Sequence, residues 1–210
     1  MVVLEGQENY FIGIQIKPEN GAVFIQTEST PNPATMKFLP GRPVLKEGAA
    51  DYPTRASAQK SPLALRLFEI EGVAGVMLGT DFITVTKSQA DWQALKPMVL
   101  GALMEHFTKG LPAVEGELAS APQREEYDAE DEEIVVQIKE LLETRVRPAV
   151  AQDGGDIVFR GFEGKSGTVF LNMRGSCAGC PSSTATLKNG IENMLRHYIP
   201  EVNAVEAVSA

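Results

Sequence analysis

Residues 174–183 read RGSCAGCPSS and place two cysteines directly before a predicted helix. Pro181 is suited to the first position of that helix, which makes Cys180 its N-cap and puts both sulfurs at the helix N-terminus. The free amide groups and the positive end of the helix dipole should lower the pKa of both thiols and favour anionic ligands. No acidic residue occurs between Met173 and Ile191, so nothing in this stretch of sequence opposes that effect.

The elements around this segment predict an α+β domain in the order α-β-β-α-β. A helix is expected over about 131–146, where Pro148 breaks it. Strands over about 156–162 and 168–174 precede the cysteines, and a strand over about 204–208 follows the second helix, so the helices cover one face of a small sheet. The inner face of the second helix is predicted to consist of Thr184, Leu187, Ile191, Met194, Leu195 and Tyr198.

The N-terminal half predicts a second small domain with strands and helices and no evident reactive cluster. Strands are expected over about 23–28, 35–39, 73–78 and 82–86. Ser61 is expected to cap a short helix that starts at Pro62, and a second helix begins near Asp91. The apolar positions of that second helix step by three and four: Trp92, Leu95, Met98, Val99, Ala102, Leu103 and Phe107. Three methionines are placed like core fillers, namely Met98, Met104 and Met194.

An acidic segment separates the two halves and carries most of the formal charge of −9. From Glu115 to Glu133 there are nine acidic residues and one basic residue, whereas the rest of the chain holds 19 acidic and 18 basic residues. With few large apolar side chains, this composition cannot offset its ordering entropy. We therefore predict a flexible acidic linker over 110–130, between an N-terminal domain at 22–109 and a C-terminal domain at 131–210.

Composition also excludes several classes of protein. There is no basic footprint for nucleic acid and no run of about 20 apolar residues for a membrane span. Residues 1–21 have neither the basic start of a signal peptide nor the arginines of a transit peptide, and are expected to be a disordered extension. Two cysteines do not make a secreted disulfide framework, so a reducing compartment fits better.

Cys177 and Cys180 are the candidate metal ligands, and their number is informative. Iron–sulfur clusters and structural zinc sites usually take four protein ligands, and this chain has two cysteines. His106 lies in the other domain, and His197 is expected far along the helix, so neither completes the shell. A four-thiolate site therefore needs two chains related by a two-fold axis. On the residues alone, a thiol–disulfide oxidoreductase, a zinc-bridged structural dimer and a surface cysteine pair without function stay open as alternatives.

Several segments in order resemble the NifU-like (Nfu) iron–sulfur protein family. The C-terminal match includes DGGDI at 153–157, the cysteine segment at 174–183 and TLKNGIE at 186–192; FIQTESTPNPATMKFLPG at 24–41 resembles the opening of the N-terminal domain found in mitochondrial and bacterial members. The resemblance implies a non-enzymatic scaffold or carrier. It would bind a [4Fe-4S] cluster between two protomers through Cys177 and Cys180 and hand it to apoproteins.

The same resemblance sets the expected partners and location. It implies a homodimer when the cluster is bound, with apo iron–sulfur client proteins and upstream assembly proteins as partners. The N-terminal domain would hold no ligand, and its turn at 30–33 is either a rigid connection or a partner surface. The expected location is the bacterial cytoplasm, with the mitochondrial matrix as the alternative.

Overall fold

The computed structural model of the chain describes residues 24–116, 125–179 and 181–208. The predicted extension 1–21, the middle of the predicted linker and Cys180 lie outside these residues. Among the described residues, none of the helices has both the length and the apolar character that crossing a membrane requires.

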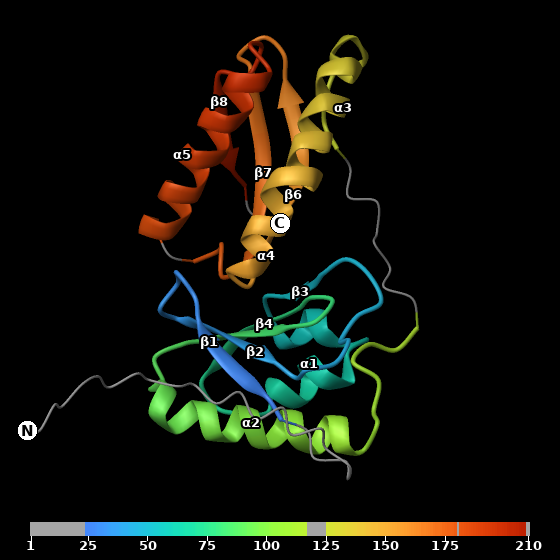
Figure 1. Cartoon of the computed structure of the whole chain (residues 1–210), viewed down its shortest axis with the longest axis vertical. Coiled ribbons are helices and arrows are strands. Elements are labelled where there is room, and N and C mark those ends of the chain that lie inside the picture. Colours follow the sequence, from blue (N-terminus) through green and yellow to red (C-terminus); the bar gives the residue numbers. More distant parts are fainter. Residues whose placement is uncertain (1–23, 117–124, 180, 209–210) are drawn as a thin grey trace, which may run out of the picture.

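The part of the chain before the acidic segment forms one antiparallel sheet with two α-helices on one of its faces (Figure 1). The strands are β1 (Gln26–Ser29), β2 (Thr35–Leu39), β3 (Ala50–Tyr52), β4 (Val73–Leu78) and β5 (Ile83–Lys87), in the spatial order β1-β2-β5-β4-β3. The helices are η1 (Arg55–Ala58, a 3₁₀ turn), α1 (Pro62–Leu67) and α2 (Trp92–Thr108). The sequence predicted the elements of this domain except for β3 and η1, whose three and four residues are too few to show a pattern.

Alternation along the strands gives this sheet a core face and an opposite face. Phe38, Val76 and Val85 point toward α1 and α2 and are buried with Leu95 and Leu103 of α2. The opposite face looks toward the C-terminal part of the chain (Figure 1). The hydrophobic face therefore holds the domain together, and the other face is available for contacts outside the domain.

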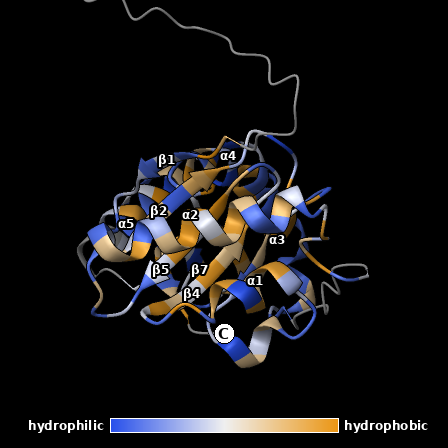
Figure 2. Cartoon of the chain, turned by 90° about the horizontal axis from the view of Figure 1, so that it is seen from below, coloured by the Kyte–Doolittle hydropathy of each residue, from blue (hydrophilic) through white to orange (hydrophobic). Residues whose placement is uncertain are grey.

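The local signals for the two α-helices are confirmed, whereas two of the three predicted core methionines are wrong. Ser61 Oγ accepts a hydrogen bond from the amide of Ala64 at 3.0 Å, and Asp91 caps α2. Met98 and Met104 are 48% and 46% exposed, because the buried stripe of α2 runs along the neighbouring row of residues. Figure 2 looks onto α2 and shows hydrophobic as well as hydrophilic residues along its outward side.

The C-terminal part has the predicted order α-β-β-α-β, with its helices on one face of a three-stranded sheet (Figure 1). Its elements are η2 (Ala129–Asp131), α3 (Glu132–Leu141), η3 (Leu142–Val146, a π-helical turn), α4 (Arg147–Gln152), β6 (Gly155–Glu163), β7 (Thr168–Gly175), α5 (Pro181–Tyr198) and β8 (Ala204–Ala207). β6 and β7 are antiparallel, and β7 and β8 are parallel. The α+β fold class predicted from the sequence is therefore confirmed.

Two details of these helices differ from the prediction. Pro148 does not break the first helix: the turn at Leu142–Val146 widens to a π-helix, and Pro148 falls in the first turn of α4, where its missing amide is not needed. Tyr198 was placed on the inner face of α5 but is 46% exposed, whereas Ile191 and Leu195 of the same face are buried. Tyr198 is the last residue of α5, and its ring lies against the guanidinium of Arg145, 4.9 Å from the ring centre, instead of in the core.

The described ends of the predicted linker 110–130 are attached to the two domains. Ser61 Oγ donates to Ala113 O at 2.7 Å, on the N-terminal side. On the other side, Glu126 forms a parallel bridge with Gly161 at the edge of β6. The attached segments are thus longer at each end than the composition predicted.

Candidate metal centre

The turn between β7 and α5 carries Cys177 where the sequence predicted it. The chain leaves β7 at Gly175, and α5 begins at Pro181. Gly175 and Gly179 have φ of +58° and +81°, in the left-handed region that glycine adopts without strain, so the chain can reverse within a few residues. The structure does not describe Cys180, whose place as helix N-cap and second ligand stays a prediction.

The thiol of Cys177 is packed against the backbone of a second turn. Cys177 is 6% exposed and belongs to the hydrophobic core of the C-terminal domain. A Cβ atom at Gly155 would lie 2.2 Å from Cys177 Sγ and 2.9 Å from Ser176 Oγ. Only glycine therefore fits at 155, because any side chain there would occupy the position of the sulfur.

Burial raises the pKa of the Cys177 thiol from 9.0 to about 12. Hydrogen bonds from the Ser176 hydroxyl and the Asp156 amide favour the thiolate, while the carboxylates of Asp156 and Asp153 oppose it. The predicted lowering of this pKa is therefore wrong in this arrangement. No acidic residue lies near Cys177 along the cysteine segment, but two carboxylates reach it from elsewhere: Asp153 follows α4, and Asp156 is at the start of β6. A metal can bind Cys177 only after the sulfur is exposed and its proton has left.

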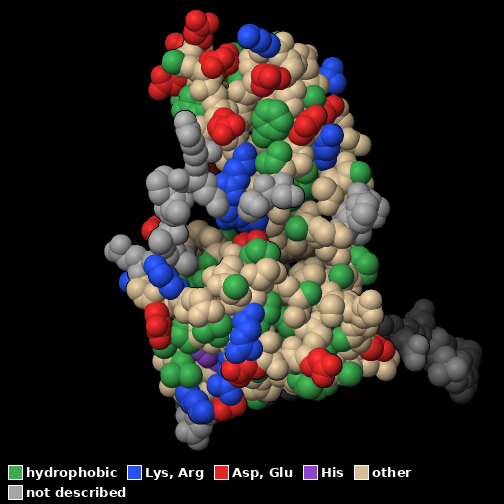
Figure 3. Space-filling view, turned by 180° about the vertical axis from the view of Figure 1, so that it is seen from behind, with side chains coloured by type: hydrophobic (Ala, Val, Ile, Leu, Met, Phe, Trp, Pro, Cys, Tyr) green, Lys and Arg blue, Asp and Glu red, His purple; other side chains and the backbone are tan. Residues whose placement is uncertain are grey.

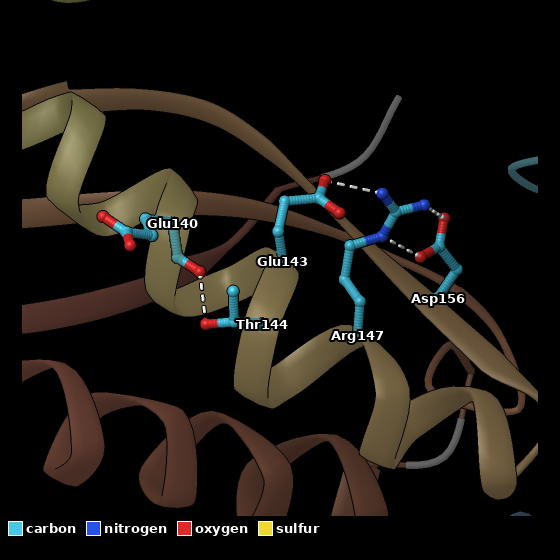
Figure 4. A network of polar contacts seen from close by, with 5 residues as sticks. All are labelled: Glu140, Glu143, Thr144, Arg147 and Asp156. Atoms are coloured by element: carbon cyan, nitrogen blue, oxygen red, sulfur yellow. Dashed lines mark hydrogen bonds and ion pairs between the residues drawn. The ribbon is translucent and has the colours of Figure 1, made fainter.

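Arg147 holds the carboxylate that lies beside this site (Figure 4). Its Nε donates to Asp156 Oδ1 at 2.8 Å and its Nη1 to Glu143 Oε1 at 2.6 Å. The π-helical turn before Arg147 includes Thr144, whose hydroxyl donates to the carbonyl of Glu140 at 2.6 Å. Because Asp156 is only 5% exposed, the ion pair with Arg147 satisfies a carboxylate that would otherwise be buried without a partner.

The histidines lie where the sequence placed them. His106 is buried in the N-terminal domain with its Nε2 3.2 Å from the carbonyl of Pro112, and His197 lies in the last turn of α5. Within residues 24–116, 125–179 and 181–208, no group of three or more His, Cys, Asp and Glu side chains could hold a metal. Among these described residues, Cys177 is the cysteine that can serve as a metal ligand.

Sequence reasoning missed three residues that shape the site: Gly155, Arg147 and Asn32. Gly155 enters the sequence analysis only as part of the family match at 153–157, although two adjacent glycines are a signal of close backbone approach. Asn32 Nδ2 donates to the carbonyl of Ala178 at 2.7 Å, from 146 residues away. No local pattern predicts that contact.

The fold and the site define a two-domain α+β protein with a dithiol segment between a strand and a helix. Residues 25–110 match the family described as "Scaffold protein Nfu/NifU N terminal", and residues 138–206 match the "NifU-like domain". The chain belongs to the NifU-like (Nfu) family.

Named relatives extend over most of the chain. The "NFU1 iron-sulfur cluster scaffold homolog, mitochondrial" of Homo sapiens is 54% identical over 89% of this chain and 72% of that protein. The "NifU-like protein 4, mitochondrial" of Arabidopsis thaliana is 51% identical over 88% of this chain, which spans 65% of that protein. Among solved structures, the NMR structure of a NifU-like protein from Saccharomyces cerevisiae has a TM-score of 0.43 and 22% identity, over 53% of this chain and all of that one.

Proposed function

We propose that this chain is an iron–sulfur cluster scaffold and carrier, without catalytic turnover of its own. It binds a [4Fe-4S] cluster through Cys177 and Cys180 and passes the cluster to apoproteins. The observation that carries this proposal is the strand–CxxC–helix segment inside a NifU-like domain. Thiolates are the ligands that iron–sulfur clusters take in proteins, so the donor set fits this cargo.

The number of cysteines supports a cluster that is shared by two protomers. Two thiols per chain supply half of the four ligands that a [4Fe-4S] cluster usually takes. A two-fold axis through the cluster supplies the other half with no further ligand. Cluster binding then drives dimerisation, and the apo chain is mainly a monomer.

Division of labour between domains follows from the same assignment. The C-terminal domain, over 131–210, holds both ligands, and the N-terminal domain, over 22–109, holds none. The segment 110–130 connects them. A donor assembly protein loads the cluster, and an apo client removes it when the client's thiolates replace one protomer's pair at a time.

The names of the relatives favour the mitochondrial alternative over the bacterial cytoplasm as the location. The human and Arabidopsis relatives are both named as mitochondrial proteins. Clients and donors are therefore sought first among mitochondrial iron–sulfur proteins.

The alternative hypothesis of a thiol–disulfide oxidoreductase has less support. A thiol–disulfide oxidoreductase attacks with a thiolate, which requires a lowered pKa and an accessible sulfur. Cys177 has the opposite properties, because its sulfur is buried and its pKa is raised to about 12. Cluster loading requires a single exposure of this sulfur rather than repeated attack at neutral pH.

Anaerobic reconstitution with ferrous iron and sulfide tests the proposal. We expect a brown protein with about four irons per dimer, and Cys177→Ser and Cys180→Ser variants that bind no cluster. The matched control is His197→Ala, which removes the one histidine of this domain and should keep the full iron content. A colourless dithiol, tightly held zinc, or full iron in Cys177→Ser would contradict the proposal.

A further inference from the structure

One row of side chains crosses the face of the N-terminal sheet that lies opposite its helices. Glu28 of β1 pairs with Lys37 of β2, Lys37 with Thr84 of β5, Thr84 with Met77 of β4, and Met77 with Asp51 of β3. We call these five residues the cross-strand row. Because side chains alternate along strands, the row cannot contact α1 or α2, and neither hydrophobic core includes Met77.

Four members of the row touch the backbone of the turns that form the cysteine site. Lys37 Nζ donates to Gln152 O at 2.8 Å, and Thr84 Cγ2 and Met77 Sδ lie so near Gly154 and Gly175 that a Cβ atom there would be 2.6 Å and 2.7 Å away. Gly175 donates its amide to the carboxylate of Asp51, which Arg174 also attracts. The contacts fall at the C-terminus of α4, on the glycine turn before β6 and on Gly175 at the end of β7.

Asn32 extends the contact into the CxxC segment. Its Nδ2 donates to Ala178 O, and Ala178 lies between the two cysteines. Its Oδ1 accepts from the amide of Ala34 at 3.0 Å, so the side chain is fixed at both ends. The N-terminal domain therefore holds the backbone on both sides of Cys177, at Gly175 and at Ala178.

The surroundings of the buried Lys37 side chain indicate a specific contact between the two domains. Lys37 is 7% exposed, and a buried ammonium is costly without partners. Its Nζ lies at the C-terminal carbonyl of α4, 5.0 Å from the centre of the Phe82 ring and 3.6 Å from Glu28 Oε2. These partners suit a cation that docks against a helix C-terminus.

The contact between the N-terminal sheet and the cysteine turn also has features of a reversible contact. Within the described residues, Thr84 Oγ1 is buried without a hydrogen-bond partner, a cost that disappears when water reaches it. Figure 3 shows Lys and Arg side chains gathered at the waist between the two parts, where a cleft is lined by Asp51, Arg147 and Arg174 among others. Contacts between domains of one chain are commonly small, polar and reversible.

We propose that the cross-strand row and Asn32 form a docking surface for the cysteine turn of the same chain, and that docking excludes a second protomer from that turn. The exclusion rests on the proposed function. A cluster shared by two protomers brings the second protomer's cysteine turn next to this one, and Asn32 of the N-terminal domain now covers this turn at Ala178. The N-terminal domain thus shields the apo site, and loading requires the domains to separate. Client thiolates reach the cluster only in the separated arrangement.

The test is the rate at which Lys37 of the full chain is acylated by a limiting amount of acetic anhydride, read by mass spectrometry and divided by the rate of exposed Lys165. In the apo chain we expect Met77→Glu to raise the relative rate of Lys37 at least about tenfold, since it places a charge inside the contact. Asn32→Asp should also raise it, because the carboxylate keeps the bond from Ala34 but cannot donate to Ala178. Met104→Glu, the same substitution on the exposed side of α2, should leave the rate unchanged.

The cluster-loaded wild-type dimer should match Met77→Glu in the reactivity of Lys37. Equal rates in the apo wild type, Met77→Glu and Met104→Glu would overturn the docking surface. A loaded dimer in which Lys37 stays as protected as in the apo chain would overturn the exclusion. A chain that binds no iron would contradict the proposed function instead, and the comparison of apo variants would still decide the docking.

Discussion

Replacing Gly155 by alanine tests the packing that surrounds the candidate ligand. The added Cβ atom would lie 2.2 Å from Cys177 Sγ and 3.1 Å from the carbonyl of Arg174. An ordinary contact needs about 3.5–4 Å, so the sulfur has to move by more than an ångström or the two turns have to separate. Gly155 and Gly175 are paired across β6 and β7, which limits how far the backbone can yield.

Overpacking of this kind costs about 1–3 kcal/mol, and we expect a loss of that size in the free energy of unfolding. The assay is urea denaturation of the apo chain, in which the midpoint falls and the slope stays constant. In a Cys180→Ser background, Cys177 of the Gly155→Ala variant should also be alkylated by iodoacetamide faster than Cys177 of the parent, because the sulfur is displaced toward solvent.

The matched control is Gly190→Ala in the middle of α5, where an added Cβ atom meets nothing within 4 Å. That change should stabilise the chain by roughly 0.5–1 kcal/mol, because alanine loses less backbone entropy in a helix. If Gly155→Ala were as stable as the wild type and left Cys177 equally protected, the close packing of these two residues would be refuted.

Three further changes have expected outcomes. Arg147→Met leaves the buried carboxylate of Asp156 without its ion pair and should lower the free energy of unfolding by about 2–3 kcal/mol, most of which Arg147→Met/Asp156→Asn should restore in denaturation. Burial lowers the pKa of His106, so the folded state binds a proton less readily than the unfolded state, and stability should be complete above about pH 6.5 and fall below it. Melting curves at pH 7.5 and pH 5 check this dependence, and His106→Gln should reduce it. Met98→Gln and Met104→Gln should each change the free energy of unfolding by less than about 0.5 kcal/mol, because both side chains are exposed; a larger loss would place them in the core after all.

Much of the fold was predictable because its signals are local. The N-cap and proline at Ser61 and Pro62, the stripe of α2 and the glycine-bounded strands β6 and β7 each depend on residues close in sequence. The prediction failed where a local rule had two outcomes. Pro148 could end a helix or open a new segment of it, and the π-helical turn before it decided for the second.

The site was predictable in position but not in its electrostatics. CxxC before a proline places Cys177 at a strand–helix turn from sequence alone. The pKa of its thiol depends first on burial and then on the carboxylates of Asp156 and Asp153, and the pairing of β6 with β7 brings these around the sulfur. The contact of Asn32 with Ala178 joins residues from different domains, so no window of sequence contains it.

The sharing of one cluster by two protomers is tested most directly by sizing the apo and reconstituted forms without oxygen, with iron measured across the peak. We expect an apo peak for one 22.7 kDa chain, a doubled mass with about four irons per dimer after reconstitution, and a return to the monomer when the cluster is chelated. A monomeric peak that carries a full [4Fe-4S] complement would contradict the shared cluster. The two cysteines of one chain would then supply only two of the four ligands, and the other two would have to be groups other than a second protomer's cysteines.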